Sequence, residues 1–457
     1  MVLNKSIKEI INGYRDKEFS PVEIVQEYLN QAKTLNPKIN AFITINEKKA
    51  IQQAEKSEKK IMAGEDLGAL EGIPISYKDS IDTKGILTTN GSAIHQERVP
   101  DSNADIVKLL QAEGAVNVGK TNMFEFGFGI TSKNSFYGDI INPWNANVTA
   151  GGSSGGSAVA VAANLCMGSI GTDTAGSIRV PSSCCGVVGL KPTHNLINMQ
   201  GIPLSNTLDH LGPIARNVGD LAAIMEAITK IPFGKDCIGD IRGMRIGVPK
   251  QYFNDLMDSN VMKYYYTAIS TLENLGAVII EIDVPVNEDP RELAHIIATS
   301  EVGYVHRELI QSSLHQYSVG AKKTFEKSRT ISAHAYIDGL HKRVQKTREI
   351  TQFFESVDII VTPTIPVAPT NIDQVELMVA GELVSVEECF IRYTCLFNIT
   401  GHPALSIPCG LYNNTIPIGL QLIANHHRED LLIKTAYSFE QSSLLDFYSS
   451  RMELVRS

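Results

Sequence analysis

The sequence predicts an α/β fold in which a twisted, mixed β-sheet is covered by helices on both faces. Short apolar runs typical of strands alternate with helical segments along the 457 residues, and such alternation favours a mainly parallel sheet. With 43% hydrophobic and 20% charged residues, the composition is ordinary for a globular protein with a large core. Neither a repeat nor a low-complexity linker divides the chain, so we expect one domain over residues 1–457.

The first half of the chain justifies this prediction element by element. Ser20-Pro21 predicts the start of a helix, because a serine cap followed by proline suits the first helical turn. Helices are expected within 6–63, over 103–113, and after the small residues of 151–157. Strands are expected over 41–45, 73–78, 115–118 and 169–172, and the segment VVGLKP (187–192) follows the last of these.

The second half alternates in the same way. We expect strands over 244–249, 278–284, 358–363, 404–408 and 418–424. Helices are expected over 260–275, most of 289–356, 386–399 and 429–442.

Charge, cysteine content and the N-terminal sequence narrow the class of protein. The net charge is −9 and no long basic run occurs, so we expect no direct binding to nucleic acid. The seven cysteines are odd in number and form no CxxC pair, which suggests neither a disulfide framework nor a zinc site. The N-terminus lacks the apolar core of a signal peptide, and no apolar run could span a bilayer. We therefore expect a cytoplasmic protein that needs no metal or cofactor and no membrane.

A nucleotide-binding loop is the first alternative for function. Residues 114–121 match the pattern GxxxxGK[ST], which requires its four middle residues in a loop after a strand. Here those residues are Ala-Val-Asn-Val, which are typical of the strand itself. We interpret 119–122 as a loop at a strand end.

A nucleophile elbow is the second alternative. Residues 151–155 match GxSxG, which would make Ser153 the nucleophile of a Ser-His-Asp hydrolase. That elbow follows a strand directly, whereas the preceding residues are polar and include Pro143. The later candidates for the base do not lie in obvious strand-end loops; they are His295, His402 and His426.

Two glycine- and serine-rich segments form the third motif. They are GGSSGGS (151–157) and GTDTAGSIRVP (171–181), with ISYKD (75–79) upstream. A predicted apolar helix and a strand separate them, so they are not a flexible linker. Glycines among serines permit unusual backbone angles and close approach of the backbone. We therefore expect both segments to be embedded in the core with a structural or chemical role.

Residues 71–220 resemble the amidase signature family. The matching motifs, in order, are EGIPISYKD, GKTNMFEFGFG, NPWN, GGSSGGSAVAVAA, GTDTAGSIRVPSSCCGVVGLKPT and SNTLDHLGPIARNVGD. Weaker similarity in TPTIPVAP (362–369) and in the segment GHPALSIPCG to PIGLQLIA extends the resemblance to most of the chain. The resemblance implies a single α/β domain around a twisted mixed sheet.

The resemblance also implies roles for particular residues. The nucleophile would be Ser177, the bridging serine Ser153, which would follow a cis peptide bond from Gly152, and the base Lys78. The donors to the oxyanion would be the backbone N–H groups of Thr174, Ala175, Gly176 and Ser177. Most family members have glycine where this chain has Ala175, although allophanate-hydrolase-like members also carry GTDTAGS. The alanine indicates a narrower site.

The chemistry requires Lys78 to be neutral, because only an unprotonated amine takes a proton from serine. Burial favours the neutral form. Lys78 and Asp79 are neighbours on a strand, so their side chains should point to opposite faces and need not pair.

Supporting roles are expected for three further residues. Asp173 and Arg179 should form a buried pair, and Ser154 should hydrogen-bond within the site or cap the helix.

An aromatic segment is the candidate substrate pocket. Met123, Phe124 and Phe126 lie there, and on a strand Phe124, Phe126 and Phe128 would share one face. They either belong to the core or form a wall of the acyl pocket.

The resemblance leaves two kinds of enzyme open. One is a free amidase that converts a small-molecule amide to the acid and ammonia or amine through an acyl-enzyme. The other is the glutaminase component of the aminoacyl-tRNA amidotransferase, known as its A subunit, which passes ammonia to a partner subunit. Phe124 stands where that component carries aspartate, and residues 318–356 do not match its glutamine-site segment. Both differences favour the free amidase, either with no partner or as a homodimer.

Overall fold

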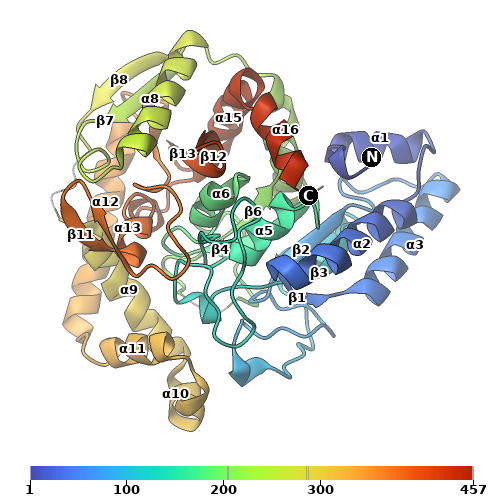
Figure 1. Ribbon diagram of the computed structural model, residues 1–457, viewed down its shortest axis with the longest axis horizontal. Coiled ribbons are helices and arrows are strands. Elements are labelled where there is room, and N and C mark those ends of the chain that lie inside the picture. The colour runs from blue at the N-terminus through green and yellow to red at the C-terminus, as the bar shows by residue number, and fades with distance from the viewer. Residues whose placement is uncertain (1, 203–204, 285, 287, 455–457) are drawn as a thin grey trace.

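An eleven-stranded mixed β-sheet forms the centre of the protein (Figure 1). The computed structural model describes residues 2–202, 205–284, 286 and 288–454. The strand order is β1-β3-β2-β4-β6-β5-β12-β13-β9-β7-β8. The strands are β1 (Phe42–Ile45), β2 (Pro74–Lys78), β3 (Val116–Thr121), β4 (Gly168–Asp173), β5 (Val188–Lys191), β6 (His210–Ala215), β7 (Arg245–Pro249), β8 (Val278–Ile282), β9 (Ile359–Pro363), β12 (Ala404–Tyr412) and β13 (Ile416–Ala424); β10 (Glu376–Val379) and β11 (Glu382–Ser385) form a separate hairpin.

The directions of the strands confirm a mixed sheet but not a mainly parallel one. Among the described residues, six neighbouring pairs are antiparallel and four are parallel. The expectation of a mainly parallel sheet is wrong for two reasons. The unpredicted strand β6 lies antiparallel between β4 and β5, and β12 and β13 form a long antiparallel pair.

Helices cover the sheet and complete the α/β fold. They are α1 (Ile7–Arg15), α2 (Pro21–Ile39), α3 (Glu47–Ala63), α4 (Asp105–Ala112), α5 (Gly155–Ala162), α6 (Arg179–Cys185), α7 (Val218–Thr229), α8 (Ser259–Asn274), α9 (Pro290–Val305), α10 (Arg307–Ser313), α11 (Val319–Ser328), α12 (Ala333–Phe353), α13 (Val386–Ile391), α14 (Cys395–Ile399), α15 (Glu429–Ser443) and α16 (Leu445–Leu454). Ser20 caps α2 and accepts a hydrogen bond from the Glu23 N–H, with Pro21 in the first turn as predicted. The predicted helix 386–399 is two short helices, α13 and α14.

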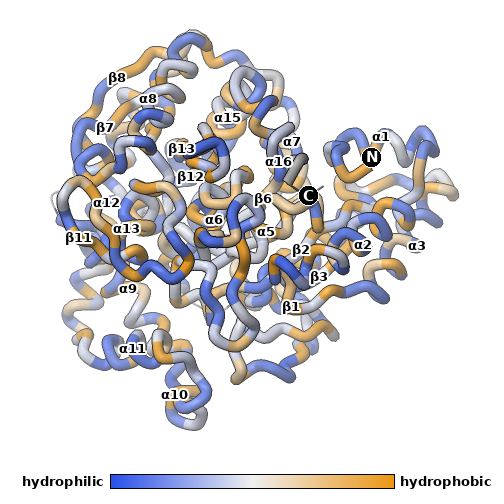
Figure 2. Tube along the Cα trace, viewed as in Figure 1, coloured by the Kyte–Doolittle hydropathy of each residue, from blue (hydrophilic) through white to orange (hydrophobic). Residues whose placement is uncertain are grey.

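The hydrophobic core lies on both sides of the sheet. One large cluster includes residues of α7, α8 and α15, and a second includes residues of α5 and α6. Hydrophobic residues follow the central strands, whereas the outer helices α2 and α3 mix hydrophobic and hydrophilic residues (Figure 2). Two-sided burial explains why the strands read as apolar runs in the sequence. Across the part of the chain described here, no helix combines the length and the apolar character needed to cross a membrane.

Candidate active site

Lys78 ends the central strand β2 and is completely buried. Its Nζ donates hydrogen bonds to Ser153 Oγ and to Thr172 Oγ1, each at 2.7 Å. Thr172 belongs to the neighbouring strand β4, and Ser153 comes from the loop before α5. The parallel pairing of β2 with β4 therefore brings two residues 94 positions apart into contact.

No carboxylate contacts the Lys78 amine among the described residues. Asp79 points elsewhere, as predicted: its Oδ2 accepts hydrogen bonds from the N–H and the hydroxyl of Thr89, and its Oδ1 lies 3.7 Å from Lys120 Nζ. Burial lowers the pKa of Lys78 to about 7, while the charges of Asp209 and Asp173 oppose that shift. A large fraction of this amine is therefore neutral near pH 7, the form that can take a proton.

The two glycine-rich segments contact each other at the end of β2. The Gly152–Ser153 peptide bond is cis. The Ser154 N–H donates to the Ser177 carbonyl at 3.2 Å. The Ser154 hydroxyl donates to the Thr172 carbonyl at 3.1 Å and does not cap α5. Both segments are thus embedded in the core, as the sequence predicts.

Ser177 lies in the loop between β4 and α6, with 4% of its surface exposed. Ser153 is also buried. In the described part of the protein, a hydrogen bond joins Lys78 to Ser153, whereas none joins the two serine hydroxyls. Catalytic hydrogen bonds commonly tighten only in the complex with substrate. A proton relay from Ser177 to Lys78 would therefore require the two serine hydroxyls to approach each other in that complex.

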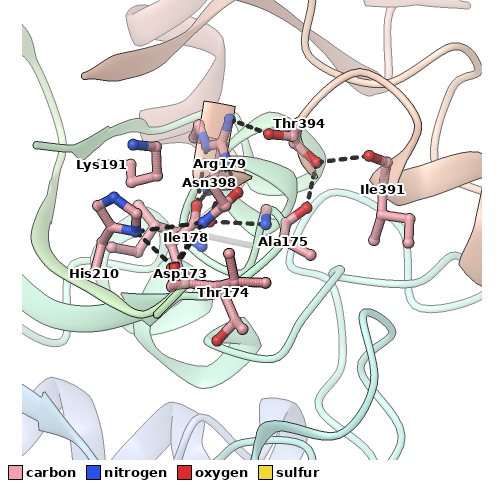
Figure 3. Close-up of polar contacts among 12 residues, drawn as sticks. Asp173, Thr174, Ala175, Ile178, Arg179, Lys191, His210, Ile391, Thr394 and Asn398 are labelled. Carbon is pink, nitrogen blue, oxygen red and sulfur yellow. Dashed lines mark hydrogen bonds and ion pairs between the residues drawn. The ribbon is translucent and has the colours of Figure 1, made fainter. Parts of the chain in front are cut away.

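Asp173 and Arg179 form the buried pair that the sequence predicts (Figure 3). Arg179 Nη2 lies 2.9 Å from Asp173 Oδ1, and Arg179 Nε donates to Asp173 Oδ2 at 3.0 Å. Asn398 Nδ2 donates to the same carboxylate at 2.8 Å. These donors hold the pKa of Asp173 well below its usual range, although burial opposes them. The pair anchors both ends of the loop that carries Ser177.

The backbone of that loop presents free donors. The Gly176 N–H donates to Asp173 Oδ1 at 2.7 Å and is therefore engaged inside the loop. For the N–H groups of Thr174, Ala175 and Ser177, the described residues provide no acceptor within hydrogen-bonding distance. Ala175 does not adopt a positive φ, so its methyl group causes no backbone strain there. Its carbonyl accepts a hydrogen bond from Thr394 Oγ1 at 2.5 Å.

A cavity of about 210 Å³ opens in front of Ser177. Its lining includes Phe128 and Ile391, together with the polar side chains of His295, Lys327, Glu387 and Glu388. The expected pocket residues lie elsewhere: Met123 and Phe126 are buried, and neither they nor Phe124 line this cavity. Residues 125–127 form a short 3₁₀ helix instead of a strand, and Phe126 stacks on Phe128 behind the cavity wall.

Three polar residues of the site were not singled out by sequence reasoning. Thr172 and Asp209 lie within the recognisable motifs GTDTAGS and SNTLDH, but nothing local assigns them a role. Asn398 lies 225 residues from its partner Asp173. Asp209 accepts hydrogen bonds from the Ser205 N–H and the Thr174 hydroxyl, and burial raises its pKa to about 7.

Changing Asp209 to asparagine is expected to move the acid limb of the kcat/KM pH profile to lower pH, by less than about one unit. The Asp209 charge raises the pKa of Lys78, so its removal lets Lys78 lose its proton at lower pH. The charge of Lys78 in turn lowers the pKa of Asp209, so the two protonation equilibria influence each other. The profile is measured by ammonia release across pH 5 to 9. A fall in kcat with an unmoved limb would contradict this electrostatic role and leave a purely structural one.

The histidines required by the elbow alternative are engaged outside the serine motifs. His295 Nε2 contacts Glu388 at 2.8 Å, and His402 contacts Thr400 and Thr351. His426 Nε2 lies 3.0 Å from the Thr400 carbonyl. Since none of the three hydrogen-bonds to Ser153, the geometry does not support a Ser-His-Asp arrangement. The described residues also contain no group of three histidine, cysteine or acidic side chains that could hold a metal ion.

The fold and the site are those of an enzyme that hydrolyses carbon–nitrogen bonds. The family described as Amidase matches residues 23–433, so the chain belongs to the amidase signature family. It is 36% identical to the A subunit of the glutamyl-tRNA(Gln) amidotransferase of Alkaliphilus metalliredigens, over 95% of this chain and 96% of that protein.

Solved structures of the family share the architecture. A crystal structure of an amidase superimposes with a TM-score of 0.91 at 26% identity, covering 96% of this chain and 100% of the other. The A subunit of the glutamyl-tRNA(Gln) amidotransferase of Thermotoga maritima superimposes with a TM-score of 0.80 at 28% identity, covering 97% and 96%. The chain is thus similar over nearly its whole length to both kinds of protein.

Proposed function

We propose that this protein hydrolyses a carboxamide with Ser177 as nucleophile, Ser153 as proton relay and Lys78 as base. One observation carries the proposal: a completely buried lysine amine, touched by no carboxylate in the described structure, donates to Ser153 Oγ at 2.7 Å. A charged lysine in that position would be costly to desolvate. The same position suits a neutral lysine that acts as a base.

The first half of the reaction forms an acyl-enzyme. Lys78 takes the hydroxyl proton of Ser153 while Ser153 takes that of Ser177, and Ser177 Oγ bonds to the carbonyl carbon. The carbonyl oxygen gains the electron pair and is stabilised by the free N–H groups of Thr174, Ala175 and Ser177. Losing one such donor typically raises the barrier by about 2.7–4 kcal/mol.

The second half releases the products. The carbon–nitrogen bond breaks, and the proton held by Lys78 returns through Ser153 to the leaving nitrogen, which departs as ammonia or an amine. Water then attacks the Ser177 ester by the same proton route, and the acid leaves. The mechanism uses only residues of this chain and water.

For the physiological substrate we propose glutamine, with this chain as the glutaminase component of an amidotransferase. The support is the 36% identity to an amidotransferase A subunit over almost the whole length of both proteins. The charges that line the cavity also suit an α-amino acid, because Lys327 can face a carboxylate and Glu387 an ammonium group. This proposal takes precedence over the free amidase that Phe124 favours.

A free amidase is the second candidate, for a specific reason. The TM-score of 0.91 to a solved amidase exceeds the 0.80 to the solved amidotransferase component. The aromatic wall at Phe128 also suits an apolar acyl group.

Ammonia release by the purified chain distinguishes the two candidates. We expect glutamine to be hydrolysed slowly by the chain alone and faster after co-purification with partner subunits, while acetamide, benzamide and amino-acid amides react weakly. Efficient hydrolysis of a non-amino-acid amide by the chain alone would instead establish the free amidase. The Ser177→Ala protein is the blank for background hydrolysis in both arms.

A further inference from the structure

A second cavity lies apart from the Ser177 pocket and shares no lining residue with it. It has a volume of about 400 Å³ and is bounded by α12, by the start of the β5–β6 connection and by the segment after β13. Its lining includes the polar or basic side chains of His194, Arg343, Thr347, Arg348, His426 and His427. We call it the arginine–histidine pocket. This group of basic side chains contrasts with the net charge of −9 of the whole chain.

The two arginines of this pocket have no ion-pair partner in the described part of the chain. The Nε of Arg343 is buried without a hydrogen-bond partner there. Other arginines are paired, such as Arg179 with Asp173 and Arg245 with Asp358. A guanidinium group is always charged, and leaving its buried N–H groups unsatisfied costs free energy. The pocket therefore holds two guanidinium groups that form no ion pair with any described residue.

Two carboxylates lie near the pocket, but other groups already engage them. Glu301, which interacts electrostatically with Arg343, accepts hydrogen bonds from the Tyr336 hydroxyl at 2.8 Å and from Thr207. Glu429 accepts the Thr193 N–H at 2.8 Å. These bonds hold both carboxylates against neighbouring loops. Neither comes within ion-pair distance of the two arginines.

His194 adds a further polar group to the pocket, and Lys191 lies close to it in the sequence. His194 Nε2 is buried and has no hydrogen-bond partner among the described residues. Lys191 Nζ donates to the His402 carbonyl at 2.6 Å, and burial lowers the pKa of Lys191 well below its usual range. Lys191 and His210 lie together beside Asp173 and Asn398 (Figure 3). Burial, and after it the charges of Arg343 and Lys191, lower the pKa of His194 to about 4, so the imidazole of His194 is neutral near pH 7.

We propose that the arginine–histidine pocket binds a small oxyanion, the carboxylate or phosphate group of a metabolite. Guanidinium groups present paired N–H donors that match both kinds of oxyanion. Arg343 supplies the unsatisfied donor inside the pocket, Arg348 supplies charge at its exposed rim, and Thr347 and His194 supply further polar groups. The proposal is independent of the reaction at Ser177.

Calorimetric titration of the full chain tests this site. Inorganic phosphate and citrate are titrated separately into the parent protein at constant ionic strength, with chloride as the blank. We expect saturable binding of at least one of them. Arg343→Gln is expected to weaken that binding by about tenfold or more, as loss of a charged hydrogen bond does. The anion that binds more tightly identifies phosphate or carboxylate as the preferred group.

Two further variants keep the test decisive. Arg348 is exposed, so Arg348→Gln should fold even if Arg343→Gln does not, and it should also weaken binding. Arg15→Gln removes the same charge from an exposed position on α1 and should leave binding unchanged. Heats that do not saturate, or affinities that are equal in all these proteins, would overturn the proposal.

Discussion

The Ser177→Ala protein is expected to lose hydrolysis almost completely, with kcat reduced by about 10⁶-fold, as serine proteases are when their nucleophile is removed. The loop that presents the free N–H groups of Ala175 and Ser177 contains one further hydroxyl, that of Thr174. This hydroxyl donates to Asp209 and is therefore not available to replace Ser177. Ammonia release measures the loss. A fluorophosphonate probe should label the parent protein at residue 177 and fail to label the variant.

Ser183→Ala is the matched control for this change. Ser183 lies in α6, six residues after Ser177, and its buried hydroxyl has no hydrogen-bond partner in the described structure. Its removal should leave both labelling and kcat close to the parent values. Labelling of Ser153 in place of Ser177 would contradict the assignment and favour the nucleophile-elbow mechanism.

The Lys78→Met protein is expected to show a kcat about 10²–10⁴-fold below the parent value, the usual contribution of a general base. Methionine has a similar length and fills the buried position without a charge, so the fold should be retained. In the parent, kcat/KM should rise with pH and level off above about 7, because burial lowers the pKa of Lys78 to about that value and only the neutral amine accepts a proton.

Stability provides a second measurement on the same variant. The pKa of Lys78 is about 7 in the folded protein, compared with 10.5 for an ordinary lysine. Between these two pH values, residue 78 carries a proton in the unfolded chain but not in the folded chain. The free energy of unfolding should therefore rise with pH across this window, by roughly 2 kcal/mol from pH 7 to 9. Urea denaturation of Lys78→Met should show this rise reduced. His426→Ala, which leaves Lys78 and both serines in place and lies outside the Ser177 cavity, should keep kcat within a few-fold; a loss as large as that of Lys78→Met would count against lysine as the base.

Local sequence patterns were enough to predict most of the elements that carry the site. The strand ending at Lys78, the strand before Asp173 and the helix after residues 151–157 were all expected, and they appear as β2, β4 and α5. Each has a strong local pattern, either an apolar run or a series of small residues. The helix α6 and the strand β6 were not expected. Proline and two serines weaken the helical pattern of α6, and only its burial against β12 and β13 explains why it forms.

The substrate pocket could not be predicted from the sequence. The alternation of Phe124, Phe126 and Phe128 is compatible with a strand, but Phe126 adopts a positive φ in a 3₁₀ helix. The cavity wall instead combines residues from α9, α11 and α13 with the loop at Ser177. Such a surface depends on how distant helices pack, and no local periodicity encodes that packing.

The amino-acid sequence alone determined the α/β class, the family resemblance and the three residues proposed for the reaction. Each of these can be recognised from short motifs whose residues are close together in the sequence. Only the tertiary structure decided that Lys78 is buried beside Ser153 and Thr172, that Asn398 and Arg179 hold the Asp173 carboxylate, and that two unpaired arginines share a cavity with histidines. The physical reason is common to all of them. A pKa shift, a buried ion pair and a pocket all depend on groups that are remote in the chain and become adjacent only after folding.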